Sequence, residues 1–241
     1  MRGVAPFWID PNDTSNRFPD VSLALKEPNG LLAIGGSLSP PRLRNAYCQG
    51  IFPWYNEDQP ILWWSPDPRA VLFPRKLHIS RSLRKTLKKS PFTLTLDTAF
   101  EQVITACSAP RQKQQGTWIS PEIHAAYCKM HQLGQAHSVE CWLGDDLVGG
   151  LYGLAFGKVF FGESMFSRVT DASKVAFVHF VKQLQHWGFA IIDCQVQSEH
   201  LTSLGAELIP RQQFVHILEN LCYLSTTPGP WQFDLMRDHS E

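Results

Sequence analysis

Residues 137–166 read HSVECWLGDDLVGGLYGLAFGKVFFGESMF, which is three apolar runs separated by two short turns. The turns are Gly144-Asp145-Asp146 and Phe156-Gly157-Lys158, and Gly and Asp accept the backbone angles of tight hairpins. Apolar runs joined this closely pair with their neighbours along the chain. The stretch therefore predicts a three-stranded antiparallel meander at the centre of the fold.

Helices and strands alternate on either side of this meander. The predicted elements before it are strands at 69–74 and 92–97 and helices at 79–89 (capped by Ser80), 98–108 (with Thr98 and Glu101 as a capping box) and from 120. After it come a helix at about 171–187, an apolar and therefore central strand at 189–197, a short helix, a strand, a last helix at 211–221 and a tail or loop at 225–241. This order is typical of acetyltransferase-like (GNAT-type) folds, which is a likeness of fold and not of function.

Residues 1–68 have a different character. They are rich in Pro, Gly, Asn and Trp, and their clearest element is a helix at 39–49. Two prolines in SPDPR, residues 65–69, forbid a regular element there and mark a boundary. We expect an α+β protein, with a small N-terminal α/β domain at 1–68 and a GNAT-like mixed-sheet catalytic domain at 69–241.

Composition restricts the class of protein. Lys plus Arg and Asp plus Glu number 22 each, so the net charge argues against bulk electrostatic binding of nucleic acid but leaves room for a local basic patch. The six Cys are scattered without a Cys-x-x-Cys pair, as in reduced cytosolic proteins. With neither a signal peptide nor a membrane-spanning run, we expect a cytoplasmic protein.

Three polar residues lie in apolar strands. Glu163 interrupts FFGESMF, and Asp193 and Gln195 lie two apart in IIDCQ. A buried carboxylate is costly without a partner. Because alternate strand residues share a face, Asp193 can polarise the Gln195 amide, whose oxygen then accepts a hydrogen bond or proton from an amine. The alternative is a buried polar network that only fixes the core.

Residues 75–89 carry seven basic residues and no acid. Arg81, Arg84, Lys85 and Lys88 form one helical stripe, a pattern that suits phosphate contacts along a nucleic acid. The alternative is an ordinary solvated face.

Other patterns are weaker. Aromatic residues such as Trp54, Trp118 and Phe180 could stack on a base or line an apolar pocket, although for any single one we favour core packing. His124, Cys128 and His131 share a helical face, which we interpret as solvated rather than metal-binding. Nucleotide-binding loops are absent, and the segment 167–176, SRVTDASKVA, lacks the Gly of an acetyl-CoA pyrophosphate turn.

Nine segments, in order from about residue 18 to about 213, resemble the bacterial leucyl/phenylalanyl-tRNA–protein transferases. They are EPNGLLAIGGSLSPPRLRNAYCQGIFPWY, LWWSPDPRAVL, LHISRSLRK, GTWI, LVGGLYG, FFGESMFSR, ASK, IDCQ and SLGAELIPR. The resemblance implies transfer of Leu or Phe, and also Met, from aminoacyl-tRNA to the N-terminal Arg or Lys of a protein. The new N-terminal residue marks that protein for degradation.

The resemblance also implies roles for residues. Glu163 would bind and orient the acceptor amine, Asp193 would polarise Gln195, and Gln195 would draw the proton from the amine, with tRNA hydroxyls as the alternative proton carriers. The donor side chain would lie among Leu151, Phe160, Gly162, Met165 and Phe180. Trp54 and Trp118 would hold the terminal adenosine, and the acceptor stem would lie on Arg81, Arg84, Lys85, Lys88 and Lys89.

The resemblance implies neither a metal nor a cofactor, and we expect a monomer. Two other classes stay open: a CoA-dependent N-acyltransferase, which the missing Gly turn disfavours, and a non-enzymatic tRNA-binding module, for which the basic stripe would suffice.

Overall fold

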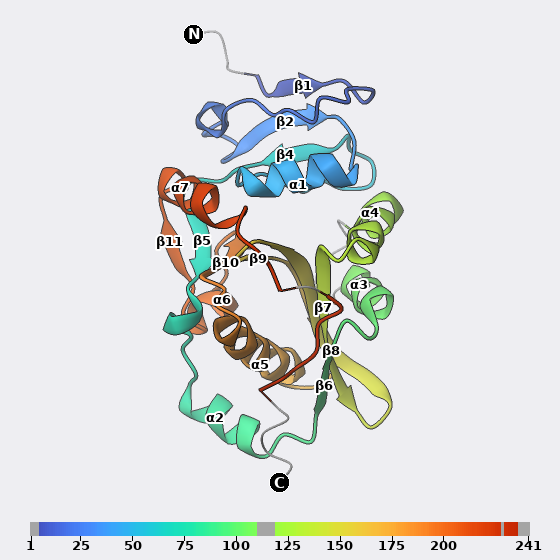
Figure 1. Ribbon diagram of the computed structural model, residues 1–241, viewed down its shortest axis with the longest axis vertical. Helices are drawn as coiled ribbons and strands as arrows, with labels where there is room; N and C mark the ends of the chain where they lie inside the picture. The colour runs from blue at the N-terminus through green and yellow to red at the C-terminus, as the bar shows by residue number, and fades with distance from the viewer. Residues whose placement is uncertain (1–4, 110–118, 228, 236–241) are drawn as a thin grey trace.

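The computed structural model describes residues 5–109, 119–227 and 229–235. Within these residues the chain forms a four-stranded and a seven-stranded β-sheet, with helices packed around them (Figure 1). The smaller sheet lies within 7–64, and the larger one begins at Arg69. The predicted α+β class, a small N-terminal unit followed by a mixed sheet, is confirmed.

The smaller sheet has the strand order β1-β2-β4-β3. Its strands are β1 Phe7–Ile9, β2 Leu31–Gly35, β3 Phe52–Pro53 and β4 Leu62–Trp64. Helix α1, Pro40–Cys48, begins after Ser39 with prolines in its first turn, as predicted, because N–H groups there have no helical partner. Gly50, at a φ of 77°, turns the chain from α1 towards β3.

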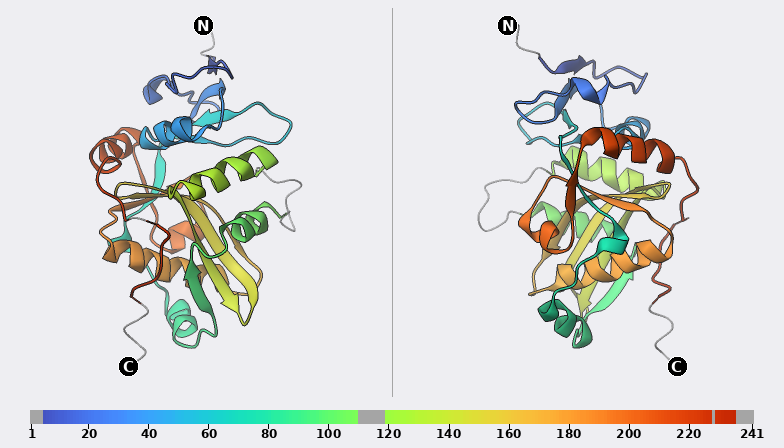
Figure 2. Two further views of the ribbon diagram at one scale, coloured as in Figure 1. Left: turned by 45° about the vertical axis from the view of Figure 1, so that its right-hand side comes forward. Right: turned by 90° about the vertical axis from the view of Figure 1, so that its left-hand side faces the viewer.

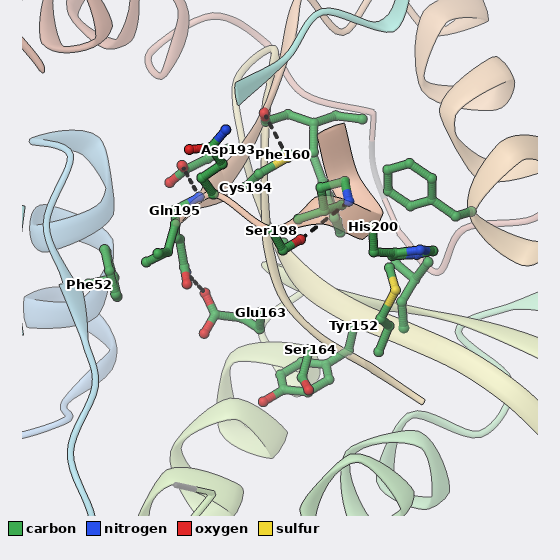
Figure 3. A pocket seen from close by; sticks show the side chains of 18 of the residues that line it. Phe52, Tyr152, Phe160, Glu163, Ser164, Asp193, Cys194, Gln195, Ser198 and His200 are labelled. Atoms are coloured by element: carbon green, nitrogen blue, oxygen red, sulfur yellow. Dashed lines mark hydrogen bonds between the residues drawn. The ribbon is translucent and has the colours of Figure 1, made fainter. Parts of the chain in front are cut away.

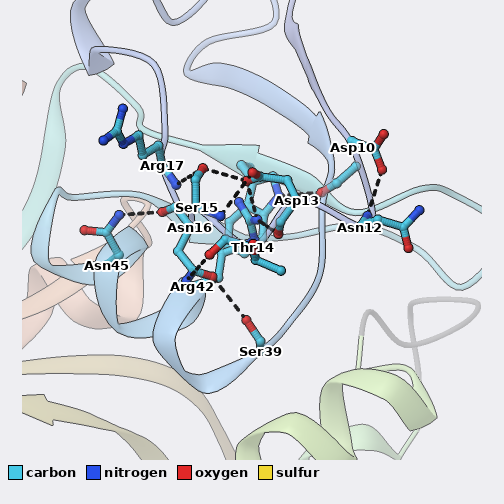
Figure 4. A network of polar contacts seen from close by, with 12 residues as sticks. Asp10, Asn12, Asp13, Thr14, Ser15, Asn16, Arg17, Ser39, Arg42 and Asn45 are labelled. Atoms are coloured by element: carbon cyan, nitrogen blue, oxygen red, sulfur yellow. Dashed lines mark hydrogen bonds and ion pairs between the residues drawn. The ribbon is translucent and has the colours of Figure 1, made fainter.

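The loop after β1 is tied to α1 by a polar network (Figure 4). Arg42, which is fully buried, donates from Nη2 to the Asp13 carbonyl at 2.6 Å and to the Asp13 carboxylate at 2.7 Å. Hydrogen bonds to the Asp13 carboxylate from Arg42 and then from Ser15 lower the pKa of Asp13 to about 2. Asn45 Nδ2 donates to the Asn16 carbonyl. The network fixes an irregular segment that has no sheet partner of its own.

The larger sheet has the order β11-β5-β10-β9-β8-β7-β6. Its strands are β5 Arg69–Leu72, β6 Thr93–Leu96, β7 Ala136–Leu143, β8 Asp146–Phe156, β9 Val159–Ser167, β10 Ile191–Gln195 and β11 Glu207–Ile209. Strands β7, β8 and β9 form the predicted antiparallel meander. β10 runs parallel to β9 and antiparallel to β5, so it is interior, as predicted.

Helices cover both faces of this sheet (Figures 1 and 2). They are α2 Arg81–Lys88, α3 Phe100–Ser108, α4 Pro121–Gln132, α5 Ala172–His186, α6 Glu199–Ser203 and α7 Arg211–Leu221, with short 3-10 turns at Val21–Leu23 and Pro74–Lys76. Apolar residues of α3 and α4 pack on one face, and those of α5 pack on the other. None of the described helices has the length and apolar character needed to cross a membrane.

The apolar core on the α3–α4 face continues into the N-terminal unit. One cluster joins Leu32 and Trp63 of the small sheet to Tyr152 and Phe161 of the large one. We propose that the boundary between the two domains falls between 68 and 69, after β4 ends and before β5 begins. The shared core would make the two domains one packed body.

Arg69 and Asp193 form a buried ion pair between β5 and β10. The guanidinium donates from Nε and Nη2 to the two carboxylate oxygens at 2.8 and 2.7 Å, and from Nη1 to the Gly50 carbonyl at 3.1 Å. Its Cζ lies 4.7 and 4.8 Å from the ring centroids of Phe52 and Phe214. The pair thus joins the sheet, the N-terminal unit and α7.

One detail of the sequence prediction is wrong. Thr98 and Glu101 do not form a capping box, because α3 begins after Ala99 and the Thr98 hydroxyl donates to Glu140 at 3.0 Å. The stretch 225–241, predicted as a tail or loop, forms no helix or strand in its described residues, but residues 229–235 pack on the sheet and Trp231 is 1% exposed.

Replacing Asp193 by Asn should lower the free energy of unfolding by about 3–5 kcal/mol, because it leaves the buried Arg69 charge without a counter-ion. The matched control is Glu207→Gln, which removes the exposed ion pair with Lys76 and should cost less than about 1 kcal/mol. Urea denaturation measures both variants. Equal losses would contradict a structural role for the buried pair.

Candidate active site

Two β-bulges on neighbouring strands build the candidate site. In the pairing of β8 with β9, Tyr152 is opposite Ser164 and Gly153 is opposite Gly162, so Glu163 is the extra residue. In the pairing of β10 with β5, Cys194 is the extra residue between Asp193 and Gln195. Bulges re-aim side chains and are common beside active sites. Here they turn Glu163 and Gln195 towards one another.

Strands β9 and β10 separate next to these two bulges. β9 and β10 pair from Val159–Ile191 to Phe161–Asp193, and β9 then continues beside β8. Gln195 has a φ of 61°, a left-handed conformation that is strained for a residue with a side chain. Such strain persists only where surrounding contacts hold it. The Asp193 Oδ1 atom, which accepts the Gln195 backbone N–H at 2.9 Å, is one of those contacts.

Glu163 accepts hydrogen bonds from three side chains. Tyr47 O–H and Gln195 Nε2 donate to Oε1 at 2.7 and 2.8 Å, and Tyr127 O–H donates to Oε2 at 3.0 Å. Burial raises the pKa of Glu163 to about 8, against the lowering effect of these donors. Burial also raises the pKa of both phenols, so they are neutral donors at any ordinary pH.

This geometry changes the predicted relation between Asp193 and Gln195. Alternation along a regular strand places both side chains on one face, but the bulge at Cys194 breaks that alternation. Asp193 therefore bonds the Gln195 backbone and not its side chain. The Gln195 amide nitrogen instead donates to Glu163. The predicted polarisation by Asp193 is wrong in this respect, because the carboxylate beside the amide is Glu163.

The Gln195 side chain has one orientation in this network. With Nε2 bonded to Glu163, its amide oxygen is turned away and accepts no hydrogen bond from the described residues. A negatively polarised acceptor on the N–H side of an amide increases the negative charge on its oxygen. The site therefore presents one oriented carbonyl oxygen beside one buried carboxyl group.

A cavity of about 600 Å³ opens beside this pair (Figure 3). Glu163 and Gln195 lie at its polar part, and Leu151, Phe160 and Met165 are among its apolar walls. The segment 52–54 of the N-terminal unit closes another side. The volume lies in the range of small-molecule sites, and a largely apolar wall with few polar groups is typical of them.

The predicted side-chain pocket is largely assembled. Leu151, Phe160, Gly162 and Met165 line the cavity, whereas Phe180 does not. Phe180 packs behind Phe160, at 4.8 Å between ring centroids in a T-shaped arrangement. Phe177, one turn earlier on α5, lines the cavity in its place. Both rings face inward on one helix, so the sequence could not distinguish them.

Of the two tryptophans predicted to hold an adenosine, the structure describes Trp54 but not Trp118. Trp54 lines the cavity at its rim and is 47% exposed. Its ring lies 6.0 Å from that of Trp64, and Trp64 Nε1 donates to the Trp54 carbonyl. Trp118 lies outside the described residues. Trp54 therefore has an accessible face for stacking.

The predicted basic stripe is an exposed helical face. Helix α2 begins with the predicted Ser80 cap, which accepts the Leu83 N–H, and Leu83 is buried beneath it. The exposed residues are Arg81, Arg84, Lys85, Lys88 and Lys89. Helix α2 packs on α5, which contributes Phe177 to the cavity. The stripe thus lies on the flank of the domain that holds the site.

The face carrying His124, Cys128 and His131 is not simply solvated. His124 contacts Thr105 of α3, and His131 stacks on Phe100 with ring centroids 4.3 Å apart. Within the described ranges, no group of three metal-ligating side chains comes together.

Sequence reasoning missed several residues of the site. Arg69 was visible only as a cation at the start of an apolar strand. Tyr47 and Tyr127 lie 116 and 36 residues from Glu163 along the chain. No local pattern connects such distant partners.

Comparisons with known proteins agree on one family. The leucyl/phenylalanyl-tRNA protein transferase model matches residues 71–219, and the model of its N-terminal domain matches 36–67. Relatives named leucyl/phenylalanyl-tRNA–protein transferase are 59% identical over 217 residues in Nitrosomonas europaea (90% of this chain, 92% of the relative) and 57% identical over 224 residues in Methylococcus capsulatus (93% and 95%).

Among solved structures, a GCN5-related N-acetyltransferase from Kribbella flavida is similar at a TM-score of 0.37 and 12% identity, over 67% of this chain and 57% of its own. L-PGS from Bacillus licheniformis is similar at a TM-score of 0.38 and 11% identity, over 71% and 57%.

The raised pKa of Glu163 makes a prediction about stability. The pKa of Glu163 is 4.5 in the unfolded state and about 8 in the folded state. At any pH between these two values, the native state binds more protons than the unfolded state. Stability of the wild-type protein relative to Glu163→Gln should therefore fall as pH rises from about 5 to 8, by an amount on the order of a few kcal/mol. Urea denaturation across this range measures it. Parallel profiles of the two proteins would contradict the raised pKa.

Proposed function

Because this chain belongs to the leucyl/phenylalanyl-tRNA protein transferase family, we propose that it transfers Leu, Phe and also Met from aminoacyl-tRNA to proteins whose first residue is Arg or Lys. It is an aminoacyltransferase. The product carries a new apolar N-terminal residue, which marks the protein for degradation. The observation that carries the proposal is the oriented Gln195 oxygen beside Glu163 at the polar part of an apolar cavity.

The reaction exchanges an ester for an amide. The α-amine of the acceptor attacks the carbonyl carbon of the aminoacyl ester, the new C–N bond forms, and the C–O bond to the tRNA 3′ end breaks. One proton leaves the amine and one proton is taken up by the departing ribose oxygen. Since the ester is already activated, the protein mainly supplies positioning and a place for the proton.

Glu163 and Gln195 would receive the acceptor amine. The Gln195 oxygen is an oriented acceptor for one amine N–H, and Oε2 of Glu163 has hydrogen-bonding capacity beyond Tyr127. An amide is a poor base, whereas a carboxyl group with a pKa of about 8 is well matched to taking a proton near neutral pH. We therefore assign the proton to Glu163 and the orientation of the amine to Gln195.

Asp193 would act indirectly, through the backbone of Gln195. Its two oxygens are held by Arg69, and Oδ1 also accepts the backbone N–H of Gln195. It therefore supports the strained backbone that aims Gln195 and does not touch the reacting atoms.

The donor side chain would enter the apolar part of the cavity. Leu151, Phe160, Met165 and Phe177 offer no charged or strongly polar partner, which suits Leu, Phe and Met and excludes polar side chains. Trp54 would stack on the terminal adenine, and the exposed cations of α2 would hold the acceptor-stem phosphates. The protein would act as a monomer in the cytoplasm, where aminoacyl-tRNA is supplied.

The geometry disfavours CoA-dependent acyl transfer. An acetyl-CoA pyrophosphate would need the N-terminus of α5, but Asp171 occupies that position with a φ of 64°. Its carboxylate accepts from Thr86 at 3.3 Å and pairs with Lys174 at 2.9 Å. The helix thus begins with an ion-paired carboxylate where a pyrophosphate-binding turn would have Gly.

Transfer of labelled Leu from Leu-tRNA to a peptide beginning with Arg tests the proposal. Label should appear on that peptide and not on one beginning with Ala, and acetyl-CoA should donate nothing. Gln195→Ala should lower kcat by about 100-fold and leave the KM for Leu-tRNA within about threefold, because it removes an acceptor-side contact. Label on both peptides, or transfer from acetyl-CoA, would overturn the proposal. Unchanged turnover in the variant would remove Gln195 from the mechanism.

Charge reversal on α2 tests the donor-binding face. Lys85→Glu with Lys88→Glu should raise the KM for aminoacyl-tRNA and reduce the slope of its logarithm against log salt by about 2, one unit for each lost phosphate contact. The control, Lys129→Glu with Lys182→Glu, makes the same change in net charge at exposed positions of α4 and α5. Similar effects in the two variants would mean that α2 is an ordinary solvated face.

A further inference from the structure

The C-terminal strap, residues 229–235, lies across the face of the large sheet that α5 covers (Figures 1 and 2). Its Trp231 and Phe233 belong to the same apolar cluster as the cavity residues Leu151 and Phe160. Trp231 is only 1% exposed. The strap therefore completes the core behind the candidate site.

Trp231 fills the space between a histidine and the aromatic wall of the cavity. Its ring stacks on His137 with centroids 3.5 Å apart and an interplanar angle of 2°. On another side its centroid lies 6.4 Å from Phe160 and 6.1 Å from Phe180. Phe160 lines the cavity, so the indole lies directly behind part of the cavity wall.

Polar contacts fix the strap in place. The Trp231 backbone N–H donates to Asp97 Oδ2 at 2.7 Å, and the same oxygen lies 2.8 Å from His137 Nδ1. Further along, Trp187 Nε1 donates to Asp234 at 3.0 Å and the Asp234 N–H donates to Gln183 Oε1 at 3.2 Å. The indole is thus anchored on both sides along the chain.

We propose that Trp231 is a specificity-determining positioning residue, which sets the depth of the apolar pocket by holding Phe160 forward. The ligand class is the bulky apolar side chain of the donor amino acid, so the inference rests on the proposed function. Phe160 has Phe180 beside it and Trp231 behind it, and a close-packed interior leaves it no room to retreat.

The size of the group behind Phe160 then decides which donor fits. A smaller side chain at 231 leaves a void, and neighbouring rings relax partly into such voids. The pocket becomes deeper on the side of Phe160. A deeper apolar pocket favours the longer phenylalanyl side chain over the leucyl one, since apolar pockets discriminate by filled volume.

The test compares Leu-tRNA and Phe-tRNA as donors to the Arg peptide, with wild-type protein and Trp231→Leu. The ratio of kcat/KM for Phe to that for Leu should rise by at least about threefold, and the change should lie in KM while kcat stays within about twofold. The control is Trp142→Leu, which removes a partly buried indole of β7 that packs against the apolar core on the α3–α4 face and does not line the cavity. Its ratio should stay at the wild-type value.

The conservative variant Trp231→Phe keeps the test decisive if Trp231→Leu does not fold. It should shift the ratio in the same direction by a smaller factor. An unchanged ratio in a folded variant, a fall in kcat alone, or an equal shift in Trp142→Leu would overturn the inference and leave the proposed function intact. Wild-type protein that transfers neither amino acid would overturn both.

Discussion

The buried ion pair of Arg69 and Asp193 is the constraint on which the site depends. A guanidinium and a carboxylate held out of water need full hydrogen bonding, and here each oxygen has its partner. The pair lies between the rings of Phe52 and Phe214, which belong to the N-terminal unit and to α7. It therefore fixes the end of β10 relative to both, and the backbone of Gln195 is held from the same carboxylate.

The strands could be read from the sequence, but the bulges could not. Alternation and turn residues located the meander and the central strand, and they identified Glu163 as out of place in its surroundings. A bulge inserts one extra residue into a strand, and residues of many types can occupy that position. The segments FFGESMF and IIDCQ therefore contain no pattern that predicts a bulge. The predicted pairing of Asp193 with the Gln195 amide was wrong for that reason alone. The sequence singled out Glu163, Asp193 and Gln195 but did not show which groups they contact.

Distant contacts explain the other differences. The sequence predicts no role for Tyr47, Tyr127 or Trp231. Only the folded chain brings the first two to Glu163 and the third behind Phe160. Residues 225–241 have no helical or strand periodicity, so the sequence predicts a tail or loop there. The described residues 229–235 are ordered by one indole and a few polar anchors, which are interactions that a periodic pattern does not record.

The phenols and the burial of Glu163 act in opposite directions on its charge, and burial dominates. The resulting pKa of about 8 is close to the ordinary value of a protein α-amine, about 7.7–8.0. A proton can then pass between acceptor amine and carboxyl group at little cost in free energy. A carboxylate with an ordinary pKa would hold the amine as a cation, which cannot attack an ester. By raising this pKa, the apolar surroundings of Glu163 make the same group able to bind the ammonium form and to release the nucleophilic amine.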